Sequence, residues 1–245
     1  MKNMKIQLNK YLMEQQKIIE ELKKLPPGQL IKRKSFYYHY ITREEQIGIT
    51  KNPELIRKLA RKKYLLVRKA QLESNFSKPL CKFDYSTSKD IIASLPNAYK
   101  DLPESYFYHP DIEAWIAADP KKNSINPDHA EYDSSGNIQF RSLAERIIAE
   151  VLVEYSLPFH YDVVIKIDGK IVSPDFIIKN PFTGVTYIWE HFGAFDKDNY
   201  ADSMNKKMNR YMKNGLTPFD NLISTYKYHI QDTRRICDLI EQIIL

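Results

Sequence analysis

Two acidic side chains stand out in residues 173–193, SPDFIIKNPFTGVTYIWEHFG, because the segment otherwise has the composition of two buried strands. A tight turn that makes Asn180 face Val185 also sets Asp175 opposite Glu190, on one face of the hairpin. Like charges in this position destabilise a hairpin, and burial increases the cost. Mg²⁺ would compensate for them, since it prefers carboxylate and phosphate oxygens. Salt bridges to nearby lysines are the alternative.

Two further residues could complete such a site. Residues 142–154 predict a helix on which Glu145 lies near the edge of the apolar half, within reach of the sheet. Ser142 as N-cap with Glu145 three residues later also fits a capping box, which is the alternative role for this glutamate. The helix predicted at 198–213 carries Lys207 on its inward-facing stripe. Such a lysine either extends along apolar surface to reach water or directs its ammonium group at the site.

Together these side chains have the chemistry that phosphodiester hydrolysis requires. A metal ion held by carboxylates activates water and stabilises developing negative charge, and a nearby lysine assists with either task. His191 follows Glu190, and strand alternation predicts that its ring points to the opposite face. A lone histidine there is more often a hydrogen-bonded core residue than a base. Its backbone carbonyl is therefore the better candidate for a metal ligand.

Positive charge is concentrated in the first third of the chain. Residues 1–82 hold 20 Lys and Arg but 7 Asp and Glu, whereas the remainder is net acidic. The pattern there predicts an amphipathic helix at 5–25, a hairpin that turns near Lys34, and a basic helix capped by Asn52. A basic module of this kind indicates a nucleic-acid partner, and a merely solvated basic face is the alternative. The residues expected to contact phosphates are Lys32, Arg33, Lys34, Arg57, Lys58, Arg61, Lys62 and Lys63.

The predicted elements divide the chain into three parts. Residues 1–82 are the basic module, and residues 83–139, rich in Pro, Asn, Asp and Ser, predict an irregular connector. Residues 140–245 predict the acid-bearing domain, with the element order α-β-β-β-α-β-α and a two-residue hairpin turn at Asp168 and Gly169. The expected fold class is therefore α+β, with helices flanking a sheet.

The domain at 140–245 resembles the PD-(D/E)XK nuclease superfamily. Pro174-Asp175 and Glu190, on consecutive predicted strands, match its signature within this element order, and Glu145 matches the acid that its first helix often supplies. A branch found in uncharacterised bacterial and phage proteins is most similar, over about residues 140–228. Its pattern reads here SPDF, YIWEHFG, Tyr200, Lys207, Tyr211 and Asn214-Gly215-Leu216.

The resemblance implies a restriction-endonuclease-like core and a catalytic set of Glu145, Asp175, Glu190 and Lys207. It also implies Mg²⁺ or Mn²⁺ held by Asp175 and Glu190, with the His191 carbonyl as a further ligand. One position departs from the pattern, since the E-x-K motif calls for lysine where this chain has Phe192. Lys207 would then act from the helix.

We therefore expect a metal-dependent endonuclease that acts on DNA in the cytoplasm. The alternatives are an inactive nucleic-acid-binding module, and a nuclease that acts on RNA or depends on a partner. No apolar run reaches about 18 residues and no secretory signal is recognisable, so no membrane association is expected. The two cysteines, Cys81 and Cys237, lack metal-ligand spacing and are expected to be free thiols. The N-terminal amphipathic helix would support a homodimer or pack within its own domain.

Overall fold

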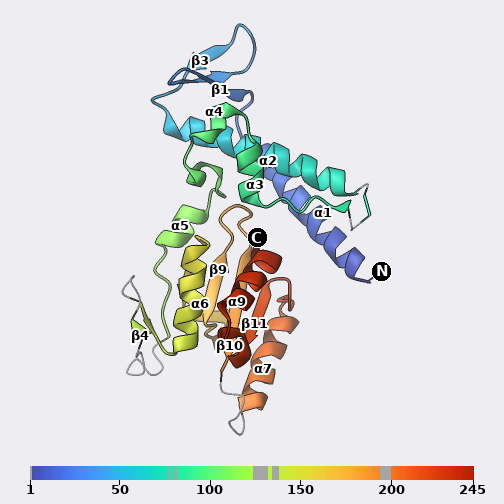
Figure 1. Cartoon of the computed structure of the whole chain (residues 1–245), viewed down its shortest axis with the longest axis vertical. Helices are drawn as coiled ribbons and strands as arrows, with labels where there is room; N and C mark the ends of the chain where they lie inside the picture. The colour runs from blue at the N-terminus through green and yellow to red at the C-terminus, as the bar shows by residue number, and fades with distance from the viewer. Residues whose placement is uncertain (1, 77, 80–81, 124–131, 134–137, 194–199) are drawn as a thin grey trace. The chain divides into compact units, whose positions relative to one another are not determined.

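The computed structural model describes residues 2–76, 78–79, 82–123, 132–133, 138–193 and 200–245. The chain divides into two compact units, Met1–His109 (unit 1) and Pro110–Leu245 (unit 2). Both combine helices with β-sheet, in agreement with a mixed α+β class (Figure 1). The boundary between the units falls inside the segment that was predicted to be a connector.

Unit 1 is built from the predicted helix, hairpin and basic helix, with short elements added. It contains α1 (Lys2–Leu22), β1 (Gln29–Arg33), β2 (Phe36–Tyr40), β3 (Gln46–Gly48), α2 (Pro53–Phe76), α3 (Ser88–Ser94), α4 (Asn97–Lys100) and η2 (Glu104–Phe107). β1 and β2 pair across a turn at Lys34, whose φ of 54° is left-handed. Asn52 caps α2, because its side chain accepts the Leu55 N–H at 3.0 Å. The third strand of this sheet, β3, was not predicted.

Two of the predicted phosphate-binding cations instead bind groups within unit 1, where Arg61 is buried and Lys62 is half-buried. Arg61 donates to both carboxylate oxygens of Glu21, at 2.7 and 2.9 Å, and to the carbonyl of Phe107 at 2.7 Å. The Lys62 ammonium donates to the carbonyls of Pro26 and Gly28, at 2.8 and 3.1 Å. Burial lowers the pKa of Lys62. Both side chains hold the end of α1 and its following loop against α2. The burial of Arg61 corrects its assignment as a phosphate contact, and the assignment of Lys62 stays a prediction.

The remaining predicted cations are closer to the surface. Arg33, Lys34 and Lys58 are exposed, and Lys32, Arg57 and Lys63 are half-buried. Lys58 pairs with Glu54 one helical turn away at 2.7 Å, and Lys32 pairs with Asp101. Ion pairs at or near the surface contribute little to stability. A nucleic-acid surface on unit 1 stays a prediction.

The buried and exposed cations of α2 should differ sharply in their effect on stability. Arg61→Met leaves Glu21 without its buried partner and should cost about 3–5 kcal/mol of unfolding free energy. Lys58→Met removes an exposed i,i+4 pair on the same helix and should cost less than about 0.5 kcal/mol. Hydrogen exchange across a urea series would resolve peptides of unit 1 from those of unit 2. Equal effects of the two substitutions would contradict the structural role of Arg61.

Unit 2 has a four-stranded mixed sheet at its centre. It contains α5 (Ile112–Ala117), β4 (Tyr132–Asp133), β5 (Gln139–Phe140), α6 (Leu143–Glu154), β6 (Phe159–Tyr161), β7 (Ile165–Ile167), β8 (Lys170–Val172), β9 (Phe176–Lys179), β10 (Thr186–Phe192), α7 (Tyr200–Lys213), β11 (Leu222–Tyr226), α8 (Lys227–Ile230), α9 (Thr233–Leu239) and a terminal turn, η4 (Ile240–Ile244). The strand order is β11-β10-β9-β6, in which β10 and β11 are parallel and the other pairs antiparallel.

The register between β9 and β10 is the predicted one. The Asn180 N–H donates to the Val185 carbonyl at 2.9 Å, and Phe176 pairs with Trp189 at the far end. One further step along this register brings Asp175 opposite Glu190. The two acids therefore belong to one face of the sheet.

Each face of the sheet packs against different elements. Phe176, Trp189 and Ile223 point toward α6 and α9 and form the larger core. Ile188 and Leu222 point the other way and pack with Val172 of β8 and Tyr211 of α7. Figure 1 shows α6 and α7 on either side of the strands. The face that carries Asp175 and Glu190 is thus the one covered by α7.

The stretch between β6 and β9 differs from the prediction of two continuous strands. β7 and β8 form a separate two-stranded sheet, with the predicted turn at Asp168 and Gly169, both at positive φ. β6 ends at Tyr161, because the φ of 49° at the following residue, Asp162, breaks the extended backbone. Pro174 then lacks the N–H that a ladder requires. As a result Asp175 immediately precedes β9 instead of lying within a strand.

None of the described helices combines the length and the apolar character that a membrane span requires. Cys237 is a free thiol, as expected. Cys81 lies outside the described residues.

Candidate active site

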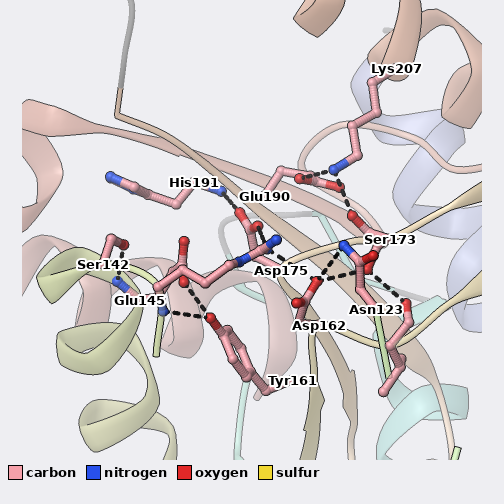
Figure 2. A network of polar contacts seen from close by, with 12 residues as sticks. Asn123, Ser142, Glu145, Tyr161, Asp162, Ser173, Asp175, Glu190, His191 and Lys207 are labelled. Carbon is pink, nitrogen blue, oxygen red and sulfur yellow. Dashed lines mark hydrogen bonds and ion pairs between the residues drawn. The ribbon is translucent and has the colours of Figure 1, made fainter. Parts of the chain in front are cut away.

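Glu190 is held by two donors from α7. Only 2% of this residue is exposed. The Tyr211 hydroxyl donates to its Oε1 at 2.6 Å, and the Lys207 ammonium donates to its Oε2 at 2.7 Å (Figure 2). Lys207 also donates to the Ser173 carbonyl at 2.8 Å. Residues four apart on a helix share a face, so α7 directs both donors at one carboxylate.

Asp175 lies across from Glu190 and has fewer partners. The His191 N–H donates to its Oδ2 at 2.6 Å, and the nearest nitrogen of Arg141 is 3.7 Å from its Oδ1. Burial raises the pKa of Asp175, and the charge of Glu190 raises it further, to about 8, although Lys207 acts in the opposite direction. Burial also raises the pKa of Glu190. The surroundings therefore do not stabilise two negative charges at this pair, and Asp175 keeps its proton at neutral pH in the metal-free protein.

Glu145 is the third predicted acid, and its carboxylate does not complete a capping box. Ser142 caps α6 as predicted, since its Oγ accepts the Glu145 N–H at 3.2 Å. The Glu145 carboxylate instead accepts the Tyr161 hydroxyl at 2.5 Å. Its charge contributes to the raised pKa of Asp175. Burial and the charge of Glu145 raise the pKa of Tyr161. Glu145 is therefore directed toward the end of the sheet where Asp175 lies.

His191 points its ring away from the two acids, as strand alternation predicts. Its Nδ1 lies 3.1 Å from the Thr225 Oγ1, which also accepts the Trp189 indole N–H at 2.9 Å. Burial lowers the pKa of His191 to about 4, with His229 adding to the effect, so the ring is neutral at neutral pH. Phe192, at the position where the motif calls for lysine, is buried. The ring of His191 is therefore a half-buried, hydrogen-bonded group on the opposite face of the sheet, and its backbone faces the site.

A cluster that was not predicted adjoins Asp175. Asp162 accepts hydrogen bonds from the Ser173 hydroxyl at 2.8 Å and the Asn123 amide at 3.3 Å, and pairs with Arg141 at 3.1 Å. Figure 2 shows Asp162 and Ser173 next to Asp175. Each is a polar residue in or beside a loop, so no periodicity marks it in the sequence.

The donor set near Asp175 and Glu190 suits a hard cation, but it is small. Among the residues that the structure describes, no three side chains of His, Cys, Asp or Glu gather as metal ligands. Two buried carboxylates with raised pKa values remain, and Mg²⁺ is commonly bound by one or two carboxylates plus water and substrate phosphate. The Tyr200 side chain, part of the quoted pattern, lies outside the described residues.

The structure thus brings Asp175, Glu190 and Lys207 together, with Glu145 at the edge of the same network. The predicted cations of the basic module all belong to unit 1 and are not part of this cluster. Comparison of the chain with protein-family models, with curated proteins and with solved structures finds no match.

Proposed function

We propose that unit 2 is a metal-dependent nuclease domain of the PD-(D/E)XK type, which hydrolyses phosphodiester bonds in DNA. The observation that carries this proposal is the contact between Lys207 and Glu190, directly across from Asp175. It supplies from α7 the lysine that is missing at Phe192. The order α6, β6, β9, β10, α7, β11, with β7 and β8 inserted between β6 and β9, supports the core that the resemblance implies.

The residues that would hold Mg²⁺ or Mn²⁺ are Asp175 and Glu190, with the His191 backbone carbonyl as the third candidate. This donor set consists of oxygen atoms alone, and a divalent cation would stabilise the second negative charge when Asp175 loses its proton. When bound, such an ion lowers the pKa of a water ligand and polarises the phosphoryl oxygens.

The chain's own residues would hold the acids in place and stabilise charge. Tyr211 and Lys207 fix both oxygens of Glu190, so its rotamer is set before substrate arrives. The Lys207 side chain is 28% exposed, which is enough for its ammonium group to approach a phosphate or a water from the edge of the site. Glu145 adds negative charge near Asp175, which raises the pKa of Asp175 and would also attract a bound cation.

Exposed cations of unit 1, such as Lys34 and Lys58, would contribute further phosphate contacts. A homodimer, which cleavage of both strands would use, and a cytoplasmic location belong to the same proposal.

Binding without catalysis is the second candidate, and one observation favours it. Both oxygens of Glu190 are already engaged by Lys207 and Tyr211, so a cation must compete with two donors. A binding module would show affinity for polyanions with steep salt dependence and no turnover.

The two candidates separate in a cleavage assay with the full chain. Supercoiled plasmid, a single-stranded DNA circle and a single-stranded RNA would be incubated with Mg²⁺, Mn²⁺ or EDTA, beside the Glu190→Gln variant. Cutting of DNA that needs the metal and is lost in the variant is the expected result. Cutting of RNA alone would keep the nuclease and change its substrate. Metal-independent binding with no cutting of any substrate would reject catalysis in favour of the binding module.

A further inference from the structure

Arg141 is a partly exposed cation that lies between two buried acids. It directly precedes the N-cap of α6, and its side chain is 30% exposed, against 12% for Asp162 and 11% for Asp175. The same nitrogen, Nη2, lies 3.1 Å from an oxygen of Asp162 and 3.7 Å from an oxygen of Asp175. The guanidinium therefore lies between solvent and the two buried acids Asp162 and Asp175.

Asp162 fixes this guanidinium beside the site. Its carboxylate is itself anchored by Ser173 and Asn123. Its backbone N–H donates to the Asp175 carbonyl at 2.9 Å, so the two acids are tied together through the main chain. Its φ of 49° lies in the left-handed region, which aspartate tolerates better than most residues. The chain thus holds Asp162 in an uncommon conformation that presents a rigid carboxylate to Arg141.

The two contacts of Arg141 differ in strength. The distance to Asp175 exceeds that of a hydrogen bond, whereas the distance to Asp162 lies within it. A cation bound by Asp175 and Glu190 would displace the longer contact and leave the shorter one, because Asp162 is not among the proposed ligands. A guanidinium carries five N–H donors, more than one carboxylate requires, and it binds phosphate oxygens in a bidentate manner. Lys207, by contrast, already donates to Glu190 and Ser173.

We propose that Arg141 binds a phosphate group of the nucleic-acid substrate next to the acid pair, with Asp162 as the residue that positions it. This inference rests on the proposed nuclease function and names the group that orients its substrate. Arg141 has no role in metal binding in this proposal, so substitution of Arg141 should weaken substrate binding without weakening metal binding.

Binding of a fluorescein-labelled 20-nucleotide single strand, measured by anisotropy in Ca²⁺ over a range of salt, tests the proposal. The full chain would be compared with Arg141→Gln, Arg141→Lys and Arg234→Gln. Arg234 pairs locally with Asp232 and has an 86% exposed side chain in the same unit, so its variant reports the effect of charge alone. Stabilisation by Mn²⁺, followed by thermal melting, reports on the acid pair separately.

Arg141→Gln should lose roughly 10- to 100-fold in affinity, as expected for a hydrogen bond to a charged group. The slope of log K against log salt should fall by about 0.7, the value for one phosphate contact on a single strand. Arg141→Lys should recover part of the affinity and part of the salt slope, and Arg234→Gln should change neither quantity. The thermal stabilisation of Arg141→Gln by Mn²⁺ should equal that of the wild type.

Four results would overturn the proposal. An unchanged salt slope in Arg141→Gln, or an equal change in Arg234→Gln, would reject a phosphate contact. A lost Mn²⁺ response in Arg141→Gln would assign the arginine to the acid pair instead. A wild type that does not bind the strand would reject this inference and leave plasmid cleavage to decide the nuclease. Binding of the strand without cleavage of any substrate in Mg²⁺ would reject the nuclease alone and leave the salt slope to decide Arg141.

Discussion

Asp175→Asn should abolish metal-dependent cleavage and, in the absence of metal, should yield a protein more stable than the wild type at pH 8 and above. The loss of activity should be at least on the order of 10³-fold, because a metal ion contributes several kcal/mol of transition-state stabilisation. Asparagine keeps the shape of the side chain and can still accept the His191 N–H, so the fold is retained. The effect on stability follows from burial of the carboxylate beside Glu190.

The sign of the pH dependence follows from the raised pKa of Asp175. In the folded, metal-free protein this pKa is about 8, compared with about 4 in an unfolded chain. Between these values the folded state keeps a proton that the unfolded state has lost. Stability of the wild type relative to Asp175→Asn should therefore fall as pH rises from about 4 to 8, by up to roughly 1.4 kcal/mol per pH unit, and level off above that.

Urea unfolding in EDTA across this pH range measures the difference, with Asp238→Asn as the control. Asp238 is exposed on α9, so its substitution should leave a pH profile parallel to that of the wild type. Mn²⁺ at about 100 times its Kd should stabilise the wild type by about 2.7 kcal/mol and should not stabilise Asp175→Asn. Parallel pH profiles for all three proteins would show that the pKa of Asp175 is not raised by folding. Equal stabilisation of the wild type and Asp175→Asn by Mn²⁺ would show that Asp175 is not a metal ligand.

The acid pair was predictable because its register depends on local chemistry. Asn180, Thr183 and Gly184 form a turn in which the Asn180 side chain accepts two backbone N–H groups, and this turn fixes which residues face each other. Strand alternation then leaves little freedom for Asp175 and Glu190. Lys207 followed from helical period in the same way, since α7 buries the stripe on which it lies.

The partners of these residues were not predictable for a different reason. Arg141, Asp162 and Asn123 lie at element ends or in loops. The direction of a side chain in these places cannot be predicted from a helix or strand periodicity in the sequence. They meet because β6 stops before Asp162 and the chain returns to the sheet at Asp175. The position of Asp175 before β9, instead of within a strand, depends on the same break.

The basic module illustrates a limit of charge patterns. Net charge predicts that a surface attracts anions, but it does not say which cations the fold itself uses. Arg61 and Lys62 lie among other lysines and arginines on α2, and nothing in the spacing distinguishes them from Lys58. Their burial became evident only once Glu21 and the loop at Pro26 were placed against the helix.

Lys207→Met should both destabilise unit 2 and remove cleavage, and the two effects should separate in a double variant. Glu190 is 2% exposed, so removal of its cation leaves a buried charge whose remaining donor is Tyr211. Breaking a buried pair in this way costs about 3–5 kcal/mol. Lys207→Met with Glu190→Gln removes the charge as well, and should recover most of that stability while remaining inactive.

Lys206→Met is the matched control, because it removes an exposed lysine from the adjacent position of the same helix. It should change stability by less than about 0.5 kcal/mol and leave cleavage intact. Urea unfolding and plasmid cleavage in Mg²⁺ would be measured on all four proteins. Cleavage by a folded Lys207→Met variant would remove the lysine from the chemistry while keeping the acids. An inactive double variant that stays as unstable as the single one would mean that the lysine stem, and not its charge, supports the site. Stability restored without activity is the result expected if Lys207 serves both the buried pair and the reaction.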